Sequence, residues 1–70
     1  MDISNMLRQA ELAKQDAEIA ADNALATVRE EKQRTGRVYP STHDAWMEAV
    51  GNYNRACRAV QMAKAHNKQH

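Results

Sequence analysis

Apolar residues recur at steps of three and four along most of the chain, which is the spacing that places them on one face of an α-helix. The first series begins at Ile3 and ends at Thr27, and the second begins at Trp46 and ends at Ala63. Each series predicts a long amphipathic helix. The first comprises Ile3, Met6, Ala10, Ala13, Ala17, Ala20, Ala24 and Thr27, flanked by Leu7, Ala21 and Val28, and the second comprises Trp46, Ala49, Tyr53, Ala56, Val60 and Ala63, flanked by Val50 and Cys57.

A single stretch between the two series has the residues of a turn. Gly36 suits the left-handed conformation that ends many helices. Pro40 holds the residue before it extended. Ser41 and Asp44 have the spacing of a capping box, with Asp in place of the usual Glu, so we expect the second helix to start near residue 41 or 42.

Two amphipathic helices joined by one turn predict one all-α domain, an antiparallel helical hairpin with alanine-rich, coiled-coil-like packing between its two helices. We expect helix over 3–34, a turn over 35–41, helix over 42–66 and a frayed tail over 67–70.

The composition indicates that such a hairpin has a thin core. Thirteen of the thirty hydrophobic residues are alanine. A chain of this length buries only about 60% of its unfolded surface. We therefore expect self-association, most simply a two-fold dimer that forms a four-helix bundle, with higher oligomers as the alternative. In outline, though in no residue motif, this resembles the two-hairpin bundle of a plasmid RNA-binding regulator, and nothing about function follows from that.

Several apolar residues lie outside the predicted helix contact. Leu12 and Ile19, seven residues apart, lie about 200° around the first helix from its alanine series. We predict that they belong to an interface with another chain, while the plainer alternative is that single apolar residues on a surface are normal. The predicted oligomer or partner interface comprises Ile3, Met6, Leu7, Leu12, Ile19, Met47 and Met62.

Charge supports the antiparallel arrangement. The chain has a net charge of +1, which divides into −4 over residues 2–31, +3 over 32–43 and +2 over 44–70. The acidic first helix would then face the basic end of the second. We expect Glu11, Asp16 and Glu18 to lie beside Arg55, Arg58 and Lys64.

The turn could also hold an anion. Three cations within six residues lie near the start of the second helix, whose backbone amides attract phosphate or carboxylate groups. The alternative is that basic residues at a helix C-terminus only offset its dipole. Candidate contacts to a nucleotide or a nucleic acid are Lys32, Arg34, Arg37, Tyr39, Ser41, Thr42 and His43 in the turn region, with Arg55 and Arg58 further along.

We predict no catalytic residue, no metal site and no cofactor. Cys57 is the only cysteine, so it cannot form an intramolecular disulfide. His66 and His70 have the spacing of paired metal ligands, but a solvated chain end explains them better. No apolar run reaches the about 18 residues of a membrane span, and we expect a cytoplasmic protein.

These observations favour a non-enzymatic, self-associating helical protein that binds a macromolecule, most simply another protein, as an adaptor, an inhibitor or a regulatory accessory protein. Its size would suit a phage or another mobile element. The first alternative is a helical bundle that binds nucleic acid through the basic residues of the turn and second helix. The second is an oligomer that binds or sequesters a nucleotide or another phosphorylated small molecule at the turn.

Overall fold

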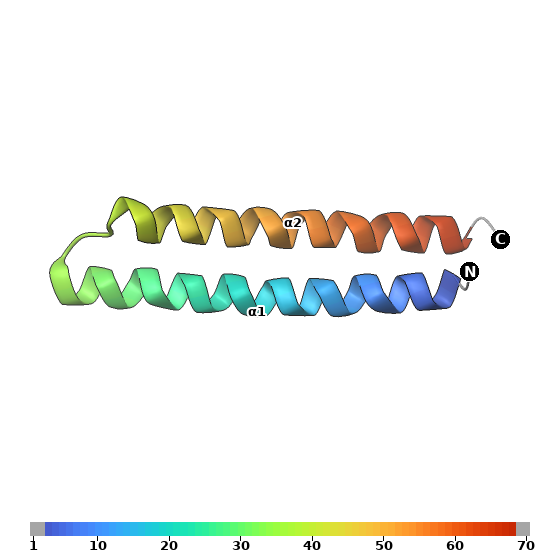
Figure 1. Ribbon diagram of the computed structural model, residues 1–70, viewed down its shortest axis with the longest axis horizontal. Helices are drawn as coiled ribbons and strands as arrows, with labels where there is room; N and C mark the ends of the chain where they lie inside the picture. Colours follow the sequence, from blue (N-terminus) through green and yellow to red (C-terminus); the bar gives the residue numbers. More distant parts are fainter. Residues whose placement is uncertain (1–2, 69–70) are drawn as a thin grey trace.

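A computed structural model describes the backbone of residues 3–68 and the side chains of residues 5–66. It consists of two helices, α1 (Ile3–Thr35) and α2 (Pro40–Lys68). They run antiparallel and side by side, with the connection at one end and the start of α1 beside the end of α2 at the other (Figure 1). The predicted all-α helical hairpin is confirmed.

Helix α1 ends at a left-handed glycine. Its 33 residues contain neither glycine nor proline, so nothing interrupts the helix before Gly36. Gly36 has a φ of +79°, and its N–H donates to the carbonyl of Lys32 at 2.8 Å. This is the role predicted for it, because a residue without a Cβ adopts this conformation at little steric cost.

The start of α2 differs from the prediction. The helix begins at Pro40, so Ser41 and Thr42 lie inside its first turn and the expected capping box at Ser41 is wrong. The carbonyl of Tyr39 accepts the first helical hydrogen bond, from the N–H of His43 at 3.0 Å. Proline favours the first helical position because its φ is already helical and its missing N–H has no partner there in any helix.

The connection is therefore shorter than predicted, and α2 is longer. It spans residues 36–39 rather than 35–41, and the helix continues to Lys68, through two residues that were expected to fray. Positions 69 and 70, and with them His70 of the His66 and His70 pair, lie outside the described residues.

The contact face of α2 is the predicted one. Val60 is buried and the other members of the series are half-buried. Val50 and Cys57 are half-buried beside them, as expected. The residues in contact with α1 follow the steps of four and three of a heptad pattern; they are Thr42, Trp46, Ala49, Tyr53, Ala56, Val60 and Ala63.

The contact face of α1 is rotated from the predicted one. Ala10, Ala17 and Ala24 are half-buried as expected, but Ala13 and Ala20 are exposed. Met6 and Thr27, also placed in the predicted series, are exposed as well. The observed series is again a strict heptad, and its members are Leu7, Ala10, Lys14, Ala17, Ala21, Ala24, Val28 and Glu31.

Side-chain size explains this rotation. The observed face covers Leu7 and Val28, whereas the predicted face would have covered Ala13 and Ala20. Burial of a Leu or Val side chain contributes about 1.5–3 kcal/mol, much more than burial of a single methyl group. Lys14 is half-buried on this face. A lysine costs little at such a position because its aliphatic stem can cover apolar surface while its ammonium group stays in water.

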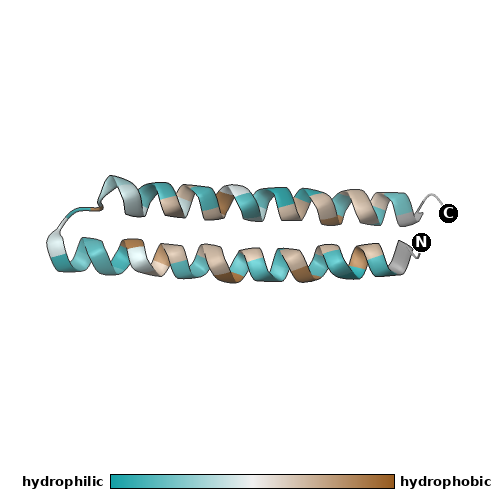
Figure 2. Cartoon of the chain, in the orientation of Figure 1, coloured by the Kyte–Doolittle hydropathy of each residue, from teal (hydrophilic) through white to brown (hydrophobic). Residues whose placement is uncertain are grey.

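The hairpin has a very small interior. Within residues 5–66, Val60, which is 4% exposed, is the only buried side chain. The molecule measures 54 × 15 × 14 Å, and polar residues recur along the full length of both helices (Figure 2). Most of the side chains are thus available for contact with other molecules.

Candidate functional site

The carboxylate of Glu31 joins the two helices at the turn. One of its oxygens accepts a hydrogen bond from the N–H of Tyr39 and the other from the Oγ1 hydroxyl of Thr42, both at 2.6 Å. Glu31 is half-buried on the contact face, one turn before the end of α1. Its negative charge lies at the N-terminus of α2, where the helix dipole favours an anion.

This arrangement bears on the predicted anion site. Lys32, Arg34 and Arg37 are all exposed around the turn. The Thr42 hydroxyl, an expected anion donor, is already bonded to Glu31, whose carboxylate would repel a second anion. The shallow pocket at the turn, about 220 Å³, is lined by Glu30 as well as Glu31 and Arg34. The anion site stays a prediction, and the carboxylates of Glu30 and Glu31 disfavour the binding of an anion there.

Leu12 and Ile19 are each 53% exposed. With Ala26, also exposed, they form a line of residues seven apart on the side of α1 turned away from α2. We call Leu12, Ile19 and Ala26 the outer stripe.

The other residues of the predicted interface lie in different environments. Leu7 is half-buried in the contact with α2, and the side chain of Ile3 lies outside the described part of the chain. Met6, Met47 and Met62 are 45%, 51% and 67% exposed. The seven residues therefore do not form one surface.

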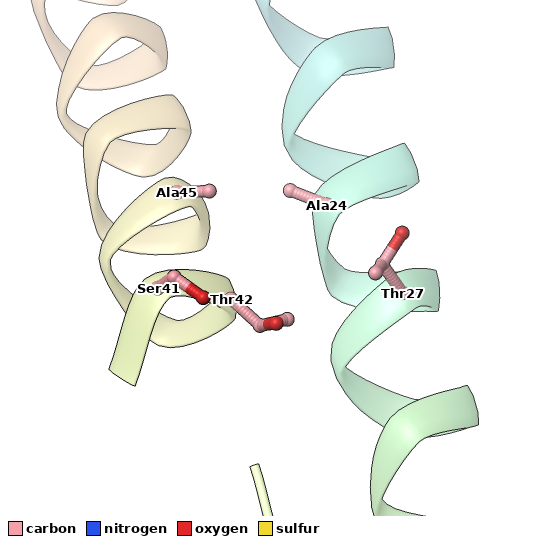
Figure 3. A pocket seen from close by; sticks show the side chains of 5 residues that line it. All are labelled: Ala24, Thr27, Ser41, Thr42 and Ala45. Atoms are coloured by element: carbon pink, nitrogen blue, oxygen red, sulfur yellow. The ribbon is translucent and has the colours of Figure 1, made fainter. Parts of the chain in front are cut away.

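A long face of the hairpin carries two parallel lines of uncharged, exposed residues. Two hollows lie at its ends. One, about 280 Å³, lies near the turn, where the methyl groups of Ala24 and Ala45 point toward each other (Figure 3). The other, about 490 Å³, lies near the chain ends between Met6 of α1 and Ala59 and Met62 of α2. We call this surface the groove face, and its lines are Met6, Ala13, Ala20 and Thr27 on α1 and Ala45, Asn52, Ala59 and His66 on α2.

The opposite face is aromatic and acidic. Trp46 and Tyr53 line a shallow pocket of about 340 Å³ together with Glu18 and Asp22. A hydrogen bond with the Cys57 thiol raises the pKa of Tyr53 above its ordinary value of 10.0, and the negative charges of Glu18 and Asp22 raise it further. Cys57 thus lies against a tyrosine hydroxyl in the helix contact, which fits a packing role.

The predicted ion pairs between the helices are not formed. Among residues 5–66, none of Glu11, Asp16 and Glu18 lies within 4.0 Å of a basic group on α2. Arg55 instead donates to the side chain of Asn52, one turn earlier on the same helix. His43 lies 3.9 Å from Asp44 and packs edge-on against Trp46, with ring centroids 6.0 Å apart.

Sequence reasoning missed Glu31, Lys14 and Leu25 as members of the contact region. Leu25 is half-buried beside Trp46. A strict heptad through Val28 would have found both Lys14 and Glu31, but no local signal marks Glu31 as the acceptor for Tyr39 and Thr42. In the part of the chain that is described, no cluster of three metal-binding side chains occurs and no helix has the length and apolarity needed to cross a membrane.

In comparisons with models of protein families, with curated proteins and with solved structures, the chain matches none of them.

Proposed function

We propose that this chain is a small, non-enzymatic helical protein that assembles with itself and acts by binding another macromolecule, as an adaptor, an inhibitor or a regulatory accessory protein. The observation that carries the proposal is the outer stripe: Leu12 and Ile19 are half exposed on a helix whose partner lies on its other side. Aligned apolar residues of this kind, one every two turns, are typical anchors for a second helix.

The shape of the surface supports binding rather than chemistry. Small-molecule sites are concave and hold a few convergent polar groups. The hollows described here are shallow and lie between two rods, and the pair of hollows on the groove face is lined mostly by alanine and methionine. A large partner can cover such surfaces, whereas a substrate would remain largely in water.

The proposal is tested by affinity purification from cells that produce the chain, followed by mass spectrometry. The test variant is Leu12→Glu with Ile19→Glu. The matched control is Gln9→Glu with Gln15→Glu, which adds the same charge at two exposed positions of the same helix that lie off the outer stripe. We expect a stoichiometric partner with the wild type and the control, and its loss from the test variant, because a carboxylate cannot be buried without a partner.

Two results would count against the proposal. Equal recovery of the same proteins by all three chains would show that the outer stripe does not bind them. Recovery of RNA or DNA that salt releases steeply would favour the nucleic-acid-binding alternative, because release of counterions makes such binding strongly dependent on salt.

A further inference from the structure

We infer that a second copy of the chain docks on the groove face, with a two-fold axis parallel to the helices. This inference rests on the self-association proposed above and assigns it a surface. The outer stripe then remains outside the four-helix bundle and available to the macromolecular partner.

The exposed area of the hairpin is the first argument. The chain exposes 5640 Å². A compact monomer of 7.9 kDa would expose about 4400 Å². The excess, about 1200 Å², is larger than the about 800 Å² that each partner buries in a standard stable interface. A face 54 Å long and 15 Å wide has the dimensions to supply that area.

The side chains of the groove face are the second argument. Its two lines contain no Asp, Glu, Lys or Arg over four consecutive heptad positions on each helix. The opposite side of the hairpin carries Glu18 and Asp22 beside its pocket. Interface centres are depleted of charge, and small residues allow helices to approach closely. The groove face therefore has the character of a helix-packing surface.

Charge at the rim identifies the occupant as a second copy. Ala10 shares a hollow with Ala63, and Ala24 shares another with Ala45, so Asp16 lies level with Arg55 across the hairpin. The helical repeat places Asp16 and Arg55 at the two outer edges of the groove face, where both are exposed. A surface with an acid on one edge and a base at the same level on the other is complementary to itself.

Asp16 and Arg55 also favour one of the two possible two-fold axes. With a two-fold axis along the helices, α1 of each copy lies beside α2 of the other at the same height, so each Asp16 meets an Arg55. With an axis across the middle of the helices, like helices lie together. Asp16 is three residues from the middle of α1 and Arg55 is one residue from the middle of α2. Each would then lie within about 10 Å, along the helix, of the same residue in the other copy. Opposite charges favour the first arrangement.

The test is sedimentation equilibrium of the full chain. The test variant is Ala59→Glu, on the groove face, and the matched control is Ala65→Glu, another exposed alanine, six residues later on the outward side of α2. We expect the wild type and the control to have twice the monomer mass. The dissociation constant of Ala59→Glu should rise by at least about 100-fold, because two carboxylates would be buried at the interface. Circular dichroism confirms that each variant is helical.

A charge exchange tests the axis without changing the apolar surface. Asp16→Arg and Arg55→Asp should each raise the dissociation constant by about three- to tenfold, and the double variant should return it to within about twofold of the wild type. Single variants that bind as tightly as the wild type, or no recovery in the double variant, would overturn the proposed axis.

Other outcomes overturn the inference as a whole. A wild type that remains monomeric at all concentrations removes the dimer, while partner capture by the outer stripe still tests the rest of the proposed function. A dimer that survives Ala59→Glu but is lost with Leu12→Glu and Ile19→Glu places self-association on the outer stripe. That result would leave the proposed function standing and the groove face unassigned.

Discussion

At the scale of the residue, the turn depends on one carboxylate. Glu31 accepts hydrogen bonds from the Tyr39 amide and the Thr42 hydroxyl and so joins the last turn of α1 to the first turn of α2. The Thr35 hydroxyl lies 2.8 Å from the Glu31 carbonyl and 2.9 Å from that of Arg37, and it can donate to one of them at a time. Side chains thus hold a connection that has few backbone bonds of its own.

We expect Glu31→Ala to lower the free energy of unfolding by about 1–3 kcal/mol, because it removes two hydrogen bonds to a charged acceptor and leaves the half-buried Thr42 hydroxyl unpaired. Denaturation by urea, followed by circular dichroism, measures the change. The control is Glu30→Ala, which removes an exposed carboxylate from the preceding position. Equal stabilities of the two variants would contradict a structural role for Glu31.

At the scale of the element, the two glycines have opposite roles. Gly36 ends α1 with a φ of +79°, where any side chain is strained. Gly51 lies inside α2, and a Cβ added there would meet only the Nη1 of Arg55, at the ordinary contact distance of 3.7 Å. The first glycine stabilises the fold by its conformation, whereas the second only weakens its helix.

The same substitution should therefore act in opposite directions. Gly36→Ala should destabilise the hairpin by about 1 kcal/mol, because alanine resists the left-handed conformation. Gly51→Ala should stabilise it by about 0.5–1 kcal/mol, because alanine restricts the unfolded chain and favours the helix. Thermal melts of the two variants at one protein concentration test both changes, and two changes of the same sign would be inconsistent with the assigned roles.

At the scale of the whole molecule, folding and assembly are expected to be linked. Within residues 5–66 only Val60 is buried, so a single hairpin gains little from its interior. A second copy on the groove face would cover apolar surface on both helices along the length of the rod. The stability of such a protein includes the free energy of association.

The midpoint of thermal unfolding should then rise with protein concentration. We expect a higher Tm over a hundredfold increase in concentration for the wild type and for Ala65→Glu, and a nearly constant Tm for Ala59→Glu, because only a dimer gains from mass action. Differential scanning calorimetry measures this. A Tm that is independent of concentration in all three chains would show that the hairpin is stable alone.

Local sequence determined the two helices, the position of the bend and the contact face of α2. The apolar spacing predicts the two helices, Gly36 predicts the bend, and the large side chains Trp46 and Val60 predict the contact face of α2. The structure agrees with each of these predictions. The predicted helix start at Ser41 is wrong because Pro40, one residue earlier, also favours a helix start. A proline at the first helical position has a stronger effect here than the capping pair of Ser41 and Asp44.

Only the tertiary structure decided which alanines of α1 face α2. Alanine occurs on adjacent lines of that helix, so the lines through Ala13 and through Ala21 are nearly equivalent by pattern alone. Burial of Leu7 and Val28, together with the bonds from Glu31 to residues on the far side of the turn, selects the second line. Those contacts join residues of different segments, and their free energy exists only after the chain has folded back on itself.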